Sequence, residues 1–268
     1  MPYAGVEGTR LWYEAAGKGA PVVFVHGGLA DSRLWDAQWK PFAAKHRAIR
    51  YDIRGYGRSE EGDLPASYTR DLGSLLEFLE IEKVAVIGLS MGGGIALQFA
   101  LDYADMVSAL VLVGTSLPGF ERSPEVDAWL EEEEAAIERG DIAAAVESSL
   151  RFWTVGPKRV PEQVDPSVLE RVREMSTKVY ANPPDESQIE EPDEPAMDRL
   201  EDVLCQSLAI VGSEDIERCH QIAKVLCDRM PVCRTHVIEG GAHHLPMEQP
   251  AEFNRVALSF LERAAEPY

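Results

Sequence analysis

The stretch Gly88-Leu89-Ser90-Met91-Gly92-Gly93 follows a short apolar run, residues 83–88, and precedes a helical pattern from Met91 to about Tyr103. A Gly-x-Ser-x-Gly motif between a buried strand and a helix predicts a sharp, strained turn that projects the serine hydroxyl. Side chains two residues before and after the serine would clash in such a turn, which accounts for both glycines. Because N–H groups at the start of the helix favour developing negative charge, Ser90 is predicted to be a nucleophile.

Short apolar runs recur along the chain and predict the strands of a mostly parallel sheet. The apolar runs are residues 21–26, 83–88, 109–114 and 208–212. Residues 46–52 and 234–238 are plausible further strands, and residues 8–14 alternate like a strand. Segments with helical spacing lie between them, at 67–80 with Ser67 as a cap, after Ser90, and from Pro250 onward. Strands that alternate with helices predict an α/β fold with helices on both faces of the sheet.

The stretch from about Pro118 to Leu200 departs from this alternation and has no convincing strand. Helices are expected at 126–139, 141–153 and 165–180, the last two capped by Asp141 and Asp165, before a return loop rich in Pro, Asp and Glu. We therefore predict a core of residues 1–117 and 201–268 and a helical cap insertion at 118–200.

These motifs resemble those of the α/β-hydrolase superfamily, in its cap-bearing branch for small substrates. The likeness covers nearly the whole chain and rests on His26-Gly27-Gly28, Asp52-Ile-Arg-Gly-Tyr-Gly-Arg-Ser59, the Ser90 turn, and a downstream acid and histidine. The chain is most similar to the 3-oxoadipate enol-lactonase and related esterase and lactonase group, on Arg151-Phe152-Trp153-Thr154 and on Ala242-His243 through Pro250. The resemblance implies a serine hydrolase of small molecules that needs no metal or cofactor.

A serine hydroxyl needs a base to take its proton and an acid to orient that base, and in this fold both follow the serine along the chain. The resemblance places the acid three residues after Gly212, at Asp215, with Glu214 as the alternative. His243 has Glu248 and Pro250 five and seven residues downstream, as similar sequences do, whereas His244 does not. We therefore predict a catalytic triad of Ser90, Asp215 and His243, with His244 in the pocket or packed beside it.

An oxyanion intermediate needs two N–H donors. Met91, directly after the nucleophile, is expected to supply one. The resemblance points to Gly28 for the other, with Leu29 as an alternative, and His26 is expected to stiffen this loop. The expected pocket residues are Trp35, His244, Trp129, Phe152 and Trp153, although packing inside the cap would explain each of the cap aromatics equally well.

These residues predict cleavage of a carboxylic ester or lactone through an acyl-enzyme. Similar haloalkane dehalogenases and epoxide hydrolases carry aspartate at the nucleophile position, so Ser90 argues against both. Carbon–carbon bond hydrolysis, cofactor-free perhydrolysis and a catalytically silent ligand-binding or receptor role remain as alternatives. A 3-oxoadipate lactonase must hold a free carboxylate, for which Arg33, Arg151 and Lys158 are the possible partners.

The composition is strongly acidic, with 46 acidic and 26 basic residues and a net charge of −20. Such a surface repels nucleic acid and anionic lipid. A secretory signal and a membrane-spanning apolar stretch are not recognisable, so a cytoplasmic protein is expected. Its four cysteines, Cys205, Cys219, Cys227 and Cys233, are therefore expected to be reduced. The sequence leaves the oligomeric state open.

Overall fold

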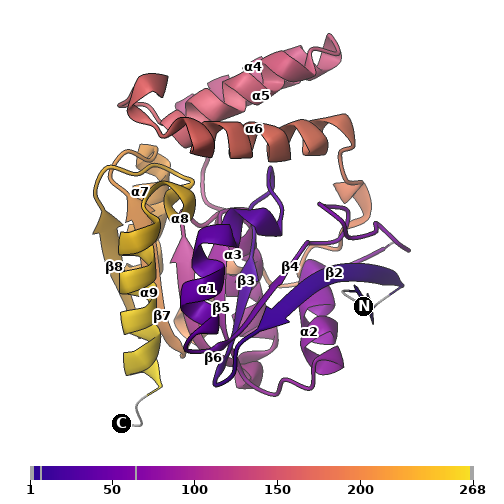
Figure 1. Cartoon of the computed structure of the whole chain (residues 1–268), viewed down its shortest axis with the longest axis vertical. Coiled ribbons are helices and arrows are strands. Elements are labelled where there is room, and N and C mark those ends of the chain that lie inside the picture. The colour runs from indigo at the N-terminus through magenta and orange to yellow at the C-terminus, as the bar shows by residue number, and fades with distance from the viewer. Residues whose placement is uncertain (1–2, 7, 64, 266–268) are drawn as a thin grey trace.

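An eight-stranded sheet in the order β1-β2-β4-β3-β5-β6-β7-β8 forms the centre of the computed structural model, which describes residues 3–6, 8–63 and 65–265 (Figure 1). The strands are β1 (Tyr3–Val6), β2 (Thr9–Ala16), β3 (Pro21–Val25), β4 (Arg47–Tyr51), β5 (Val84–Leu89), β6 (Val107–Val113), β7 (Gln206–Gly212) and β8 (Cys233–Ile238). β1 pairs with β2, and β2 with β4, in antiparallel fashion, and the other neighbours are parallel. The predicted mostly parallel sheet is confirmed, and β1 is an addition to it.

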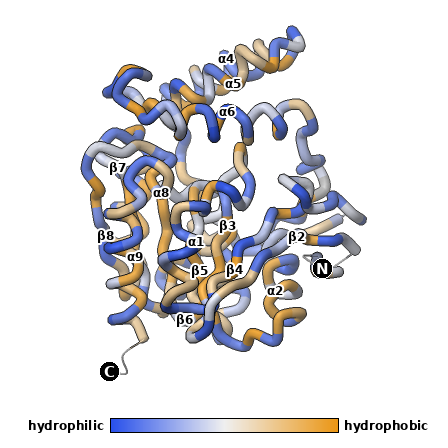
Figure 2. The backbone as a smooth tube through the Cα atoms, in the orientation of Figure 1, coloured by the Kyte–Doolittle hydropathy of each residue, from blue (hydrophilic) through white to orange (hydrophobic). Residues whose placement is uncertain are grey.

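Alternate residues of the central strands supply two separate cores, one on each face of the sheet. In β3, Val23 and Val25 pack with residues of α2 (Tyr68–Phe78), α3 (Met91–Asp102) and α7 (Glu217–Arg229). Val22 and Phe24 pack on the opposite face with α1 (Asp36–Ala43) and α9 (Pro250–Ala264). Figure 2 shows the hydrophobic residues concentrated in these central strands. Burial on both faces explains why β3, β5, β6 and β7 read as continuous apolar runs in the sequence.

Residues 118–200, here called the helical segment, connect β6 to β7. They form α4 (Pro124–Glu138), α5 (Ile142–Ser149), a π-helical turn (Leu150–Val155) and α6 (Pro166–Ala181), followed by short 3-10 turns. Asp141 accepts a hydrogen bond from the Ala144 amide at 3.1 Å and Asp165 accepts one from the Ser167 amide at 2.8 Å, so both act as N-caps. The three helices lie across one end of the sheet, beyond the elements of the core (Figure 1).

The expectation of four reduced cysteines is wrong for two of them. Cys227, near the end of α7, forms a disulfide with Cys233 at the start of β8. The tight connection between helix and strand brings their Cα atoms within 4.7 Å, which lies inside the range that a disulfide spans. Cys205 and Cys219 remain free. Among the described residues, no helix has both the length and the apolar character needed to cross a membrane.

Candidate active site

Ser90 lies at the junction of β5 and α3 in a strained backbone conformation. Its φ of 53° and ψ of −118° are unfavourable for a residue with a side chain, at a cost of about 1–3 kcal/mol. The neighbouring glycines make the turn possible. A Cβ atom on Gly88 would lie 2.2 Å from the Gly92 carbonyl oxygen, and one on Gly92 would lie 2.4 Å from the His26 carbonyl oxygen. Only glycine fits at either position, as the motif predicts.

A buried carboxylate–imidazole pair forms at the ends of two other strands. Asp215 follows β7 and His243 follows β8, and Asp215 Oδ2 lies 3.0 Å from His243 Nδ1. The two side chains are only 2% and 5% exposed. The Ile216 amide donates to the other carboxylate oxygen at 2.9 Å, which fixes its orientation. A proton on Nδ1 therefore has an acceptor, and Nε2 is left to act as a base.

Glu214, the alternative acid, faces a different partner. Its carboxylate accepts a hydrogen bond from the Ser213 hydroxyl at 2.8 Å, and the side chain is half-buried. The Ser213 hydroxyl in turn accepts from the Gly240 amide at 3.0 Å. Of the two adjacent acids, only Asp215 contacts a histidine.

Three neighbours of His243 were not anticipated from the sequence. The Trp153 ring lies 4.5 Å from the imidazole, centroid to centroid, and the Trp153 carbonyl accepts from the His243 amide at 3.2 Å. Gly114 leaves room for the ring, because a Cβ there would lie 2.9 Å from Nδ1. The Cys219 thiol lies 3.8 Å from the same nitrogen. Its position four residues after Asp215, one helical turn on, is the sequence signal that could have revealed it.

Asp215, Cys219 and His243 are also the one group within the described residues with the side-chain types and spacing to hold a metal ion, with ligand atoms within 4.8 Å of one another. Two of these groups already share a hydrogen bond, and all three are buried. Burial also holds the pKa of the Cys219 thiol well above its ordinary value, which keeps the sulfur protonated and a poor metal ligand. The arrangement therefore suits an oriented imidazole better than a metal centre.

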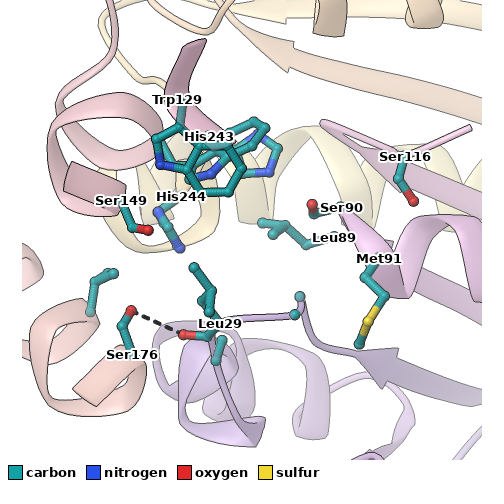
Figure 3. Close-up of a pocket in the computed structure, with 15 residues that line it drawn as sticks. Leu29, Leu89, Ser90, Met91, Ser116, Trp129, Ser149, Ser176, His243 and His244 are labelled. Carbon is teal, nitrogen blue, oxygen red and sulfur yellow. Dashed lines mark hydrogen bonds between the residues drawn. The ribbon is translucent and has the colours of Figure 1, made fainter. Parts of the chain in front are cut away.

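A cavity of about 200 Å³ lies between the helical segment and the carboxyl ends of the parallel strands. Figure 3 shows the Ser90 hydroxyl and the His243 ring at its border. The lining from the core also includes Gly28, Leu29, Leu89, Met91 and His244, and the lining from the helical segment includes Trp129, Ser149, Trp153, Val172 and Ser176. The cavity thus brings together the predicted nucleophile, base, oxyanion donors and three of the five predicted pocket residues.

Trp35 and Phe152, two of the five predicted pocket residues, do not line this cavity. Trp35 is fully buried below it, where its ring packs 5.0 Å from Phe24 and 6.1 Å from Phe253. The 3-10 turn Ser32–Trp35 directs this side chain into the core. Phe152 stacks on Trp129 at 5.2 Å and supports that lining residue instead of touching the cavity.

His26 stiffens the loop that carries Gly28. The Ile53 amide donates to His26 Nε2 at 2.9 Å, so the ring proton must sit on Nδ1, which lies 2.8 Å from the Gly27 carbonyl oxygen. Burial lowers the pKa of His26, which keeps this single-proton arrangement. The imidazole thus ties the loop after β3 to the loop after β4, and holds Gly28 at the edge of the cavity.

A strained serine between a strand and a helix, facing a buried carboxylate–imidazole pair across a cavity at the carboxyl ends of parallel strands, defines an α/β-fold hydrolase. The chain belongs to the alpha/beta hydrolase family, whose model matches residues 22–256.

Similar proteins fall within this class. "Putative carbamate hydrolase RutD" of Azorhizobium caulinodans is 27% identical over 97% of this chain and 98% of its own length. The solved structure of the enol-lactonase from Burkholderia xenovorans has a TM-score of 0.80 at 24% identity, and covers 97% of this chain and 100% of its own. A thermophilic esterase from Thermogutta terrifontis has a TM-score of 0.77 at 26% identity, and covers 96% and 95%.

Proposed function

We propose that this protein is a serine hydrolase that cleaves a small carboxylic ester or lactone through an acyl-enzyme on Ser90. The observation that carries the proposal is the buried pair of Asp215 and His243 at the cavity into which the strained turn directs Ser90. The relatives named as esterase and enol-lactonase support the same reaction class.

In the first half of the reaction, Ser90 Oγ attacks the carbonyl carbon of the substrate while His243 Nε2 takes the hydroxyl proton. Asp215 holds the imidazole in place and stabilises the cation that forms. The Gly28 and Met91 amides are the proposed donors to the negatively charged oxygen. The intermediate then collapses, the bond to the alkoxy oxygen breaks, and the imidazolium proton goes to that oxygen. In a lactone, the released hydroxyl stays attached to the acyl group.

In the second half, a water molecule gives a proton to His243 and its oxygen attacks the acyl carbon. Collapse of this second intermediate breaks the bond to Ser90 Oγ, which recovers its proton from the imidazolium. The carboxylic acid then leaves, and the enzyme returns to its starting state.

The helical segment is proposed to act as a cap that selects the substrate. It contributes Trp129, Ser149, Trp153, Val172 and Ser176 to one wall of the cavity. Ser176 also donates a hydrogen bond to the Leu29 carbonyl at 3.2 Å, which joins this wall to the loop after β3 (Figure 3). A substrate held against this wall would present its carbonyl group to Ser90. Exclusion of water by the cap would strengthen the electrostatic interactions in the site.

Labelling with a fluorophosphonate tests the activated serine. Intact mass is measured after incubation of the wild type and of Ser90→Ala under the same conditions. We expect one adduct on the wild type and none on the variant, followed by turnover of p-nitrophenyl esters by the wild type alone. A folded wild type that gains no adduct would contradict the proposal and favour a ligand-binding role on the same fold.

A further inference from the structure

The cavity beside Ser90 offers no positive charge to a substrate. Its described lining consists of apolar and aromatic side chains, glycines, serine hydroxyls, and the imidazoles of His243 and His244. Lysine and arginine are absent from that lining. A carboxylate that entered would lose its hydration and find no lysine or arginine in the described lining to replace it.

The first basic residue that the sequence suggested as a carboxylate partner is already occupied. Arg33 Nη2 lies 2.7 Å from Asp31 Oδ2, and its Nη1 lies 2.5 Å from Glu174 Oε1 in α6. These two carboxylates neutralise the guanidinium, and Arg33 does not reach the lining of the cavity. Arg33 thus joins the segment that follows Gly28 and Leu29 to the helical segment, and leaves no charge for a ligand.

The other two basic residues point elsewhere. Arg151 pairs with Glu132 at 2.5 Å on the outside of the helical segment, where its side chain is 64% exposed. Lys158 donates to the Ser213 carbonyl, two residues before Asp215, at 2.7 Å. Neither residue borders the cavity. All three basic residues considered for carboxylate binding are therefore held outside the site.

His244 supplies a polar but neutral group. Its Nδ1 lies 3.1 Å from the Thr154 hydroxyl oxygen, and its ring borders the cavity (Figure 3). Burial, and to a lesser extent repulsion by His243, lowers the pKa of His244 to about 3. The ring therefore carries no charge at neutral pH and can offer a substrate a hydrogen bond but not a counter-ion.

We propose that this site accepts esters or lactones whose acyl part is uncharged and rejects those whose acyl part carries a carboxylate. This inference rests on the proposed hydrolysis at Ser90 and specifies its substrate class. It separates the protein from a lactonase of 3-oxoadipate, whose substrate retains a free carboxylate. The fold and triad can be shared between the two, while the cavity lining determines which acyl group is stabilised.

Two nearly isosteric esters test the proposal on the wild-type enzyme. p-Nitrophenyl adipamate ends in a neutral amide, and mono-p-nitrophenyl adipate ends in a carboxylate of the same size. At pH 7.5 we expect kcat/KM to be at least about 100-fold higher for the amide, because the carboxylate would be desolvated without a counter-ion. Equal values, or a preference for the carboxylate, would overturn the proposal.

The fluorophosphonate experiment separates the two possible failures. Normal labelling at Ser90 with equal turnover of both esters would overturn the substrate class and leave the hydrolase proposal intact. Absence of labelling and of turnover for both esters would overturn the hydrolase proposal, and the substrate class with it.

A charge placed in the lining tests the electrostatic cause. Val172 in α6 borders the cavity, so Val172→Lys adds an amine there and Val172→Met adds similar length without charge. We expect the ratio of carboxylate to amide kcat/KM to be at least about tenfold higher in the lysine variant than in the methionine variant. The same ratio in both folded variants would contradict the electrostatic cause. The wild-type comparison decides the proposal even if the lysine variant does not fold.

Discussion

Asp215 and Glu214 are adjacent acids with opposite surroundings. Asp215 is buried against His243, and Glu214 is half-buried against the Ser213 hydroxyl. Where a strand passes into a loop, consecutive side chains point in different directions. Asp215 therefore orients the imidazole of His243, while its neighbour Glu214 pairs with the Ser213 hydroxyl. The acid to which the resemblance pointed, three residues after Gly212, is the one that contacts the histidine.

Substitution of each acid by its amide tests this assignment. Asp215→Asn keeps the shape but favours the wrong imidazole tautomer, and we expect kcat to fall by about 10⁴-fold. Glu214→Gln should change kcat by less than about threefold, because its carboxylate does not contact the triad. Steady-state kinetics with a p-nitrophenyl ester measures both. A larger loss for Glu214→Gln than for Asp215→Asn would show that the acid is misassigned.

Some contacts of the site could not be predicted at the residue scale. The glycines flanking Ser90 follow from a local motif, whereas Gly114 approaches His243 from the end of β6, which is distant in sequence. The position of Trp153 over the imidazole depends on how the π-helical turn meets the loop after β8. Such contacts depend on tertiary packing, and no local pattern encodes them.

Among the elements, the helical segment and α8 (Leu245–Glu248), which follows the His243 loop, are joined by a buried ion pair. Arg159 lies 2.7 Å from Glu248, and the two side chains are 8% and 4% exposed. Arg159 also donates to the carbonyl groups of Thr154, Val155 and Gly240. Glu248 accepts from the Ala242 amide at 2.9 Å, next to His243. This pair therefore fixes the histidine loop against the helical segment.

Removal of the guanidinium tests the coupling between the two elements. Burial raises the pKa of Glu248, and Arg159 offsets part of that effect, so Arg159→Ala leaves a buried acid without its partner. We expect the free energy of unfolding to fall by about 3–5 kcal/mol. kcat should fall as well, because the loop carrying His243 loses its support.

Arg151→Ala is the matched control for this experiment. It removes an arginine of the same helical segment from an exposed pair with Glu132, which should cost no more than about 1 kcal/mol. Urea unfolding and ester turnover are measured for both variants. Equal effects of the two substitutions would show that the buried pair has no special role.

The sequence predicted the central elements well because they are buried on both faces. β3, β5, β6 and β7 appear as apolar runs, and β2 appears through alternation, whereas β4 and the largely exposed edge strand β8 carry charged side chains. β1 and α1 were not predicted: β1 spans only four residues, and α1 contains Pro41, which ordinarily argues against a helix. The position of Trp35 depends on the same region, because the 3-10 turn before α1 directs its ring into the core and away from the cavity lining.

For the whole molecule, the net charge of −20 sets the surroundings in which the site works. A predominantly negative surface lowers the local concentration of anionic substrates. The surface charge and the cavity lining both disfavour an anionic substrate. Salt screens the long-range effect of the surface, whereas the lining acts at short range. A preference for the neutral ester that persists at high ionic strength therefore reports on the cavity and not on the surface.

Stability against pH is also a property of the whole molecule, and His244 should contribute to it. Its pKa is about 3 in the folded chain, against an ordinary value of 6.5. Below pH 6.5 the unfolded chain therefore binds a proton that the folded chain does not, so the contribution of His244 is present above pH 6.5 and is lost as pH falls. Between pH 7 and pH 5 we expect a loss of about 2 kcal/mol from this residue.

Comparison of the wild type with His244→Gln isolates this effect, because glutamine keeps hydrogen-bonding groups near Thr154 and does not titrate. Urea unfolding at pH 7, 6 and 5 measures the free energy of unfolding of each protein. The pH-dependent contributions of the carboxylates and of His26 are common to both proteins, so they cancel when the two free energies of unfolding are subtracted. The wild type should lose about 2 kcal/mol more than the variant over this range. Parallel curves would mean that His244 is protonated in the folded state, and a cation would then be present in the cavity after all.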